Sequence, residues 1–205
     1  MQYIDLPVEM RHHIFMAYVA FFSSIKVLMT IIHVLTAVCA MGAAFSADVL
    51  FHFYASNRTL SRAELRTLSI LSRVVWYGLL ALVMSGGAIM LSDPAKYLLS
   101  VKFLAKMTVV CVLVVNGIVL NAYVSRHLAR EKFLSARREA FARHVAFACG
   151  AISAISWVSA LALGVMDNIR FSYAGVIGVY AGLLFIGVIG SFIFERVAFA
   201  SHVLK

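Results

Sequence analysis

The chain has few charged residues, little proline and little cysteine. Only 13% of its 205 residues are charged and 63% are hydrophobic, whereas a soluble domain has about 25% charged residues. With 2 prolines and 12 glycines, the sequence has no long polar segment that would form a separate soluble domain. The three cysteines fall in apolar stretches and show no CxxC or Cys/His metal spacing, which excludes a disulfide framework. The composition therefore excludes an ordinary soluble protein.

The sequence contains five long apolar stretches. Each is long enough to cross the roughly 30 Å hydrocarbon layer of a bilayer as a helix. They lie at residues 27–51, 68–92, 99–124, 143–166 and 174–197. We therefore expect an all-α fold, a polytopic membrane helix bundle of five transmembrane helices, in which residues 1–205 form a single integral membrane domain.

Residues 1–26 precede the first span, and they predict an N-terminal interfacial helix. Apolar and aromatic residues alternate with polar ones over residues 8–25, which is typical of a helix that lies in the membrane surface. The alternative is a sixth, shorter span from about residue 12. That span would place Lys26 inside the bilayer, which costs a few kcal/mol near its centre.

Lysines and arginines outside the spans are distributed unequally, and they predict the orientation. Eleven lie on one side, against five on the other; the eleven are Arg58, Arg62, Arg66, Arg126, Arg130, Lys132, Arg137, Arg138, Arg143, Arg196 and Lys205. The positive-inside rule places this side in the cytoplasm. We expect a bacterial inner-membrane protein with its N-terminus outside. The net charge of +9 then reflects topology and contact with anionic lipid, chiefly at the basic connection 125–142, and no nucleic acid is expected.

The first span carries a histidine and an aspartate on one helical face. Residues His33 and Asp48 share this face with several alanines, which are Ala37, Ala40, Ala44 and Ala47. Small residues let helices approach closely, and ionisable groups in a membrane turn toward the bundle interior. A neutral imidazole at His33 is a candidate metal or haem-iron ligand, or a proton relay. The alternative is a histidine that only forms a hydrogen bond to a neighbouring helix.

Two lysines in the third span lie on one face and near the same membrane surface as His33. Lys106 is seven residues into its span and His33 is six residues into the first, so the two are predicted to share one pocket in the outer leaflet. With Lys102, such a pocket would attract an anion such as a haem propionate. The alternative is that both lysines extend to the outer membrane surface through their long stems.

Polar residues near the cytoplasmic end predict an ion pair. Asp48 and Arg73 lie at similar depths in consecutive spans, and an unpaired charge there would be costly. Asn116 and Asn121 in the third span are expected to complete a polar interior. The functional alternative is a proton relay in which Asp48 accepts the proton and His52 releases it.

Aromatic and small residues in the second and fourth spans form a further candidate site. Trp76 and Trp157, together with Gly86 and Gly87, are suited to line a porphyrin or quinone pocket. The alternative is ordinary membrane packing.

The fifth span contains one GxxxG pattern, at Gly178 and Gly182. This pattern predicts a close helix contact, either within the chain or across a homodimer.

Three runs in the first three spans carry a family resemblance. They are IIHVLTAVCAMGAAFSADVLFHF, LSRVVWYGLLALVMSGGAIML and YLLSVKFLAKMTVVCVLVVNGIVLN. This succession, within residues 27–124, resembles the superfamily of small four-helix membrane proteins that includes the copper-resistance protein D family and the haem-containing protoporphyrinogen oxidase family. The resemblance implies a functional histidine in the first span and a functional lysine in the third, together with bound haem b. By motif position these correspond to His33 and to Lys102 or Lys106. Residues 143–205, the last two spans and tail, lie outside it.

The leading expectation is thus a membrane protein that binds haem b or does redox chemistry. A small ion or metal transporter would instead use Asp48, Arg73, Asn116 and Asn121 as polar stations, although five spans without an inverted repeat are not the usual carrier plan. A non-catalytic assembly subunit of a membrane complex would need only the glycine-rich fifth span.

Overall fold

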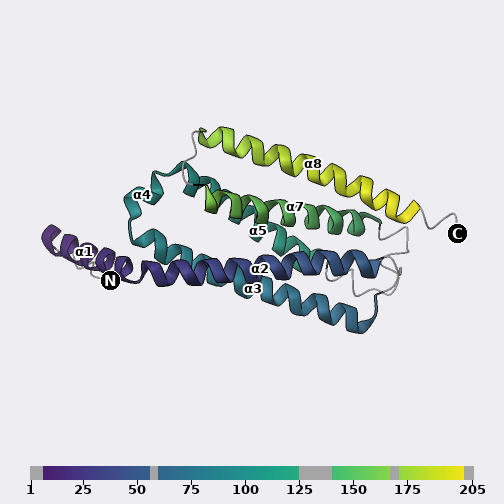
Figure 1. The fold of residues 1–205 in the computed structure, drawn as a ribbon, viewed down its shortest axis with the longest axis horizontal. Coiled ribbons are helices and arrows are strands. Elements are labelled where there is room, and N and C mark those ends of the chain that lie inside the picture. Colours follow the sequence, from purple (N-terminus) through teal and green to yellow (C-terminus); the bar gives the residue numbers. More distant parts are fainter. Residues whose placement is uncertain (1–6, 56–59, 125–139, 167–170, 201–205) are drawn as a thin grey trace, which may run out of the picture.

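The computed structural model describes residues 7–55, 60–124, 140–166 and 171–200, and within these ranges every regular element is a helix (Figure 1). The elements are α1 (Val8–Ser24), α2 (Lys26–Ala55), α3 (Arg62–Leu91), α4 (Pro94–Leu98), α5 (Val101–Val119), the π-helical turn η1 (Leu120–Val124), α7 (Ala140–Val165) and α8 (Tyr173–Ala200). Five stretches are long and apolar enough to cross a membrane: Lys26–Tyr54, Arg62–Leu91, Val101–Val124, Phe141–Val165 and Tyr173–Arg196. The predicted multi-pass helical bundle is confirmed. Most of the basic connection 125–142 lies outside the described residues.

The helix starts follow local capping signals in the sequence. At the start of α3, the Ser61 hydroxyl accepts a hydrogen bond from the Glu64 amide at 3.2 Å, and the Glu64 carboxylate accepts one from the Ser61 amide at 2.6 Å. This reciprocal capping box begins the helix at Arg62, six residues before the predicted start of the span. The short helix α4 was not predicted; Asp93 caps it and Pro94 occupies its first turn.

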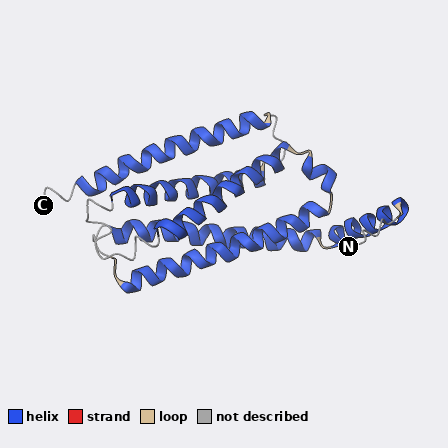
Figure 2. Ribbon diagram, turned by 180° about the vertical axis from the view of Figure 1, so that it is seen from behind, coloured by secondary structure: helices blue, strands red, loops and turns tan. Residues whose placement is uncertain are grey.

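The five long helices form two groups (Figure 2). Helices α2 and α3 pack side by side, and α7 packs against both α5 and α8. At the α2–α3 crossing, a β-carbon built on Gly78 would lie 2.6 Å from the β-carbon of Ala40. A side chain larger than that of glycine would therefore clash at this crossing. Close backbone approach of this kind supplies the packing contacts that hold helices together in a bilayer, where hydrophobic burial gives no driving force.

Helix α1 extends beyond the end of the α2–α3 pair, and Ile25 joins it to α2 (Figure 1). The helix touches α3 and α2 and is exposed along most of its length, with aromatic side chains such as Phe15, Tyr18 and Phe21 uncovered. The predicted helix before the first span is therefore present. Because no bilayer is part of the structure, the choice between an interfacial helix and a sixth span stays a prediction.

Two buried clusters join the helix groups at different depths. One contains Ala40, Ala44, Leu79, Leu113 and Trp157, which come from α2, α3, α5 and α7. The other lies nearer the C-terminal end of α2 and contains Val124, Ala142 and Ala146, with Phe51 and Leu120 packed against them. Residues of both clusters border a cavity that lies between them.

Candidate functional site

His33 lies in a hydrogen-bonded centre formed by α2, α3 and α5. Its Nδ1 atom is 2.9 Å from the Ser85 hydroxyl, and its Nε2 atom is 3.5 Å from the Lys106 ammonium nitrogen. The Ser85 hydroxyl also lies 2.7 Å from the Ala81 carbonyl oxygen. The structure therefore brings His33 and Lys106 together; their depth in the outer leaflet stays a prediction.

The hydrogen-bond partners assign the protons of this centre. An ammonium only donates hydrogen bonds, so His33 Nε2 is the acceptor in its contact with Lys106. The imidazole is then the neutral tautomer that carries its proton on Nδ1 and donates it to the Ser85 hydroxyl. The Ser85 proton is left for the Ala81 carbonyl. Both ring nitrogens are engaged.

Glycine in α3 makes room for this imidazole. A β-carbon on Gly86 would lie 3.2 Å from His33 Cε1, whereas one on the neighbouring Gly87 would meet nothing within 4 Å. The Ser85–Gly86 pair thus supplies both the hydrogen bond and the space. This part of the glycine-bearing segment therefore packs against a histidine.

Lys102 is engaged elsewhere, although the sequence grouped it with His33. Its ammonium donates hydrogen bonds to the Gly164 carbonyl at 3.2 Å and to the Met166 carbonyl. These carbonyls are at the C-terminal end of α7, where they lack helical partners, and a cation there also complements the helix dipole. In this geometry Lys102 caps α7, and its cofactor role stays a prediction.

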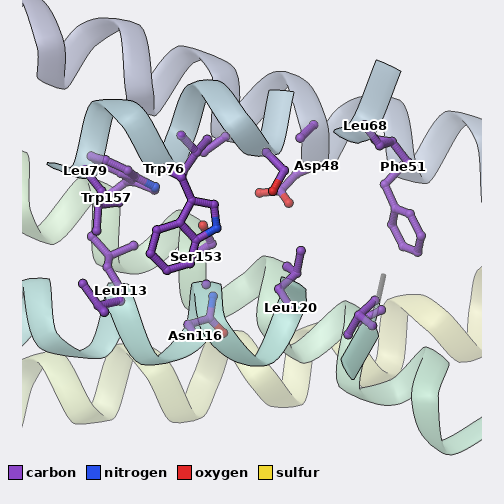
Figure 3. Close-up of a pocket in the computed structure, with 18 residues that line it drawn as sticks. Asp48, Phe51, Leu68, Trp76, Leu79, Leu113, Asn116, Leu120, Ser153 and Trp157 are labelled. Atoms are coloured by element: carbon purple, nitrogen blue, oxygen red, sulfur yellow. The ribbon is translucent and has the colours of Figure 1, made fainter. Parts of the chain in front are cut away.

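The cavity lies about four helical turns further along α2, between the two helix groups (Figure 3). Its volume is about 130 Å³. Most lining side chains are apolar, and six are polar or carry a polar atom; these six are Asp48, Ser72, Trp76, Asn116, Ser153 and Trp157. Trp157 lies at one end beside Leu79, whereas Phe51 and Leu68 lie at the other end. The arrangement is typical of a small-molecule site, which is mostly apolar with a few polar groups that orient the ligand.

Asp48 enters this cavity without the predicted ion pair. Among the described residues, ion pairs join only Glu195 to Arg143 and to His144. The Arg73 side chain is exposed, because the α3 residues that face the cavity are its neighbour Ser72 and the next turn at Val75 and Trp76. One residue along a helix turns the side chain by about 100°. The Asp48–Arg73 pairing was therefore wrong.

Asn116 and Asn121 lie in different surroundings. Asn116 is buried, and its side-chain amide donates a hydrogen bond of 2.9 Å to the Cys149 carbonyl, which joins α5 to α7. Asn121 is exposed, because it follows Leu120, whose side chain lines the cavity. The prediction of a polar interior thus holds for Asn116 and was wrong for Asn121.

The two tryptophans of the chain both line the cavity. Trp157 is 4% exposed, and its Nε1 is a buried polar atom without a hydrogen-bond partner among the described residues. Trp76 packs across Gly117, where a β-carbon would lie 3.4 Å from Trp76 Cζ2. A buried indole N–H without an acceptor is rare in native proteins. The Trp157 side chain borders the cavity, but its Nε1 atom is fully covered, so the unused N–H is not exposed there.

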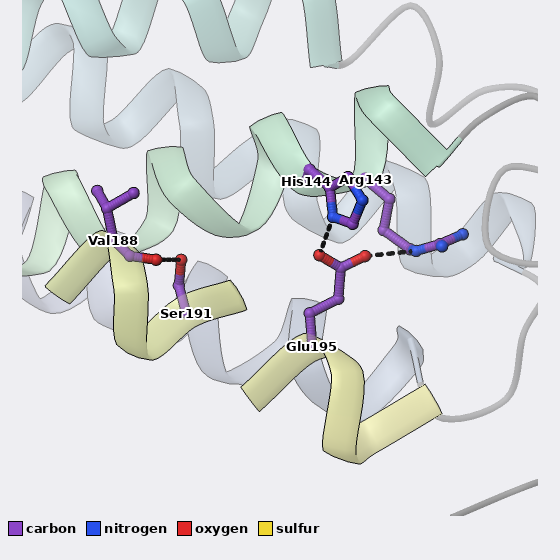
Figure 4. A network of polar contacts seen from close by, with 5 residues as sticks. All are labelled: Arg143, His144, Val188, Ser191 and Glu195. Carbon is purple, nitrogen blue, oxygen red and sulfur yellow. Dashed lines mark hydrogen bonds and ion pairs between the residues drawn. The ribbon is translucent and has the colours of Figure 1, made fainter. Parts of the chain in front are cut away.

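A polar cluster between α7 and α8 was not predicted from the sequence. Glu195 is 2% exposed; its carboxylate accepts a hydrogen bond from Arg143 Nε at 2.7 Å and another from His144 Nδ1 (Figure 4). Nearer the start of α8, the Tyr180 hydroxyl lies 2.7 Å from the Ser156 hydroxyl of α7. Glu195 is the sole acidic residue in the fifth span, and a lone acid in a membrane helix requires a partner. That signal alone would have found the cluster.

Metal-ligating side chains do not gather in the part of the chain that the structure describes. No group of three or more histidine, cysteine, aspartate or glutamate residues lies close enough there to hold an ion. The three cysteines are free thiols; Cys39 and Cys111 are exposed, and Cys149 is buried. His33 therefore belongs to no such group among the described residues.

Comparison of the chain with protein-family models, with curated proteins and with solved structures finds no match.

Proposed function

We propose that this multi-pass membrane protein binds a small, largely apolar molecule in the cavity between α2, α3, α5 and α7. The observation that carries the proposal is the mostly apolar cavity of about 130 Å³, which six side chains with polar atoms border. One of them is Asp48, which has no ion-pair partner among the described residues.

The cost of this arrangement supports a binding role. A cavity of 130 Å³ forgoes about 3 kcal/mol of packing at roughly 24 cal/mol per Å³. A ligand that fills the space would recover this packing energy. Natural proteins keep such local defects chiefly where a function requires them.

Filling the cavity tests this proposal. Ala47 lines it, whereas the adjacent Ser46 is exposed on the outer side of α2. We use durene, a single aromatic ring with four methyl groups, as the probe. Durene should raise the thermal unfolding temperature of the purified protein, because it binds the native state only. Ala47→Leu should abolish that rise, and Ser46→Leu should leave it unchanged. An equal rise in all three proteins would refute binding in the cavity.

Haem b at His33 is the second candidate, favoured by the closeness of His33 to Lys106. The observed arrangement does not fit haem, since Ser85 and Lys106 occupy both ring nitrogens. In addition, the cavity is not adjacent to His33, because Ala44 at the cavity wall is eleven residues, or about 16 Å, from His33 along α2. A haem bound to His33 would therefore not occupy this cavity. The test is the absorption spectrum after haem is added. Ligation requires a Soret band that His33→Ala removes and the control His52→Ala retains; an unchanged band in His33→Ala rejects it.

We further propose that the protein lies in a bacterial inner membrane with its N-terminus outside, its C-terminus inside and its basic connection against anionic lipid. The eleven-to-five distribution of lysines and arginines supports this orientation. A phosphatase that is active only in the periplasm should be inactive when fused to the C-terminus. An active fusion would contradict the orientation.

The GxxxG face of α8 is proposed as a homodimer contact. A β-carbon on Gly178 or Gly182 would meet nothing within 4 Å, so this face packs against no other described part of the chain. Gly182→Leu should convert a dimer to a monomer in light scattering of the detergent-solubilised protein, whereas the equally open Gly190 should tolerate leucine. A wild-type monomer, or a dimer unaffected by Gly182→Leu, would exclude this contact.

A further inference from the structure

We propose that the ligand of the cavity is a small organic cation, an ammonium group on a compact apolar body, and that its charge pairs with the Asp48 carboxylate. This inference rests on the binding function proposed above and names the chemical class of its ligand.

Asp48 gives the cavity a negative charge that no other lining residue compensates. It is the only ionisable acidic or basic side chain among the residues that line the cavity. In the described part of the chain, ion pairs join only Glu195 to Arg143 and to His144. An unpaired carboxylate in the apolar interior of a membrane protein is costly. A cationic ligand supplies the missing counter-charge, whereas an anionic ligand would meet a like charge and no basic group.

The carboxyl group of Asp48 reaches from α2 to α7. A β-carbon on Gly150 of α7 would lie 3.4 Å from Asp48 Oδ1, so the absence of a side chain there leaves room for the carboxyl group between the two helices. Ser72, Asn116 and Ser153 line the same cavity, and hydroxyl and amide oxygens accept hydrogen bonds. The cavity therefore offers neutral acceptors to the N–H groups of an ammonium that Asp48 does not bind.

The apolar part of the lining selects an organic cation over a metal ion. Most lining side chains are apolar, whereas a hard cation such as Ca²⁺ takes roughly six to eight oxygen ligands. No group of three or more histidine, cysteine, aspartate or glutamate residues in the described ranges could hold a metal ion. The cavity volume of about 130 Å³ is near the ~150 Å³ of an engineered cavity that binds benzene. It therefore fits one ring that carries an ammonium group.

Aromatic rings near Asp48 strengthen the preference for a cation. Along the cavity, Asp48 lies between Trp76 and Phe51 (Figure 3). The Trp76 ring packs on Gly117, where a β-carbon would lie 3.4 Å from Trp76 Cζ2. The face of an aromatic ring attracts an ammonium group within about 6 Å of its centre, and tryptophan does so most strongly. A neutral ligand of the same shape gains neither this attraction nor the ion pair.

The test compares two probes of nearly the same size and shape that differ in charge. Benzylamine is an ammonium ion at neutral pH, and benzyl alcohol has an uncharged hydroxyl group in the same position. Titration calorimetry in an uncharged maltoside detergent measures the affinity of the purified protein for each probe, after the heats for empty micelles are subtracted. We expect benzylammonium to bind at least about tenfold more tightly than benzyl alcohol. Ala47→Leu should abolish the binding of both probes, and Ser46→Leu should leave it unchanged, which places the binding in the cavity.

The variant Asp48→Asn removes the charge and keeps the shape of the side chain. It should weaken benzylammonium binding about tenfold or more and change benzyl alcohol binding less than about twofold. The alcohol reports on the cavity itself, so this pattern separates a lost ion pair from a damaged fold.

Two results would overturn the cation assignment and leave the binding function standing. In the first, durene binds the wild type but benzylammonium binds no more tightly than benzyl alcohol, as a protonated Asp48 would require. In the second, Asp48→Asn binds benzylammonium as tightly as the wild type does. If neither durene nor either benzyl probe binds the wild type, both proposals fall.

Discussion

The bundle contains two intramembrane polar centres on the same face of α2, and they differ in how fully their hydrogen bonds are satisfied. In the first, His33 uses both ring nitrogens, with Ser85 and Lys106 as partners, and a glycine of α3 packs against its ring. In the second, Asp48 and Trp157 border a cavity; among the described residues Asp48 has no ion pair and Trp157 Nε1 has no hydrogen-bond partner. A satisfied centre stabilises the fold, whereas an unsatisfied one is available to a ligand. The more conspicuous residue in the sequence, His33, therefore belongs to the structural centre.

The largest expected effect compares the two ionisable residues directly. His33→Ala should lower the free energy of unfolding by about 2–4 kcal/mol, because it opens a space and leaves Ser85 and Lys106 without their partner. Asp48→Asn should change it by less than about 0.5 kcal/mol or raise it, because Asp48 has no ion pair to lose. Denaturant unfolding in mixed micelles measures both. A larger loss in Asp48→Asn than in His33→Ala would reverse the comparison.

The two adjacent glycines of α3 test whether the His33 centre is closely packed. Gly86→Leu should destabilise the protein by about 1–3 kcal/mol, because its side chain would overlap the His33 ring. Gly87→Leu is the matched control, since a β-carbon there meets nothing within 4 Å. Thermal unfolding of the two variants under the same detergent conditions provides the measurement. Equal stability would show that His33 has free space beside it.

The Ser85 hydroxyl gives a smaller effect that reports on the proton arrangement. Ser85→Ala leaves the His33 Nδ1 proton without an acceptor and should cost about 1 kcal/mol. In a double-mutant cycle with His33→Ala, most of that cost should disappear, because the two side chains act on the same hydrogen bond. Additive losses would mean that Ser85 and His33 are energetically independent.

The smallest expected effect concerns Asp48 and Arg73. Since Arg73 is exposed and no ion pair joins the two residues, their alanine substitutions should be additive within about 0.5 kcal/mol. A double-mutant cycle in thermal unfolding measures the coupling energy. Coupling well above that range would restore the ion pair that the sequence suggested.

The transmembrane helices and the inward face of α2 could be predicted from the sequence because they depend on local properties. Length, hydropathy and capping residues such as Ser61 act within a single helix. The match in depth between His33 and Lys106 also follows from counting residues along two helices. The partner of Asp48 could not be predicted in this way, because similar depth in two spans leaves the rotation of each helix undetermined. Arg73 lies one residue from the face that meets the cavity, and it is exposed.

By itself, the sequence determined that the chain forms a bundle of five apolar helices, since a bilayer satisfies backbone polar groups only within helices or closed barrels. It also determined which residue types are available inside the bundle. Only the tertiary structure decided which of them satisfy one another. His33 meets Ser85 and Lys106, Lys102 caps α7, Glu195 binds Arg143 and His144, and Trp157 is left with an unused donor beside a cavity. Helix rotation and close approach at glycines determine these pairings, and both depend on how the five long helices pack at once.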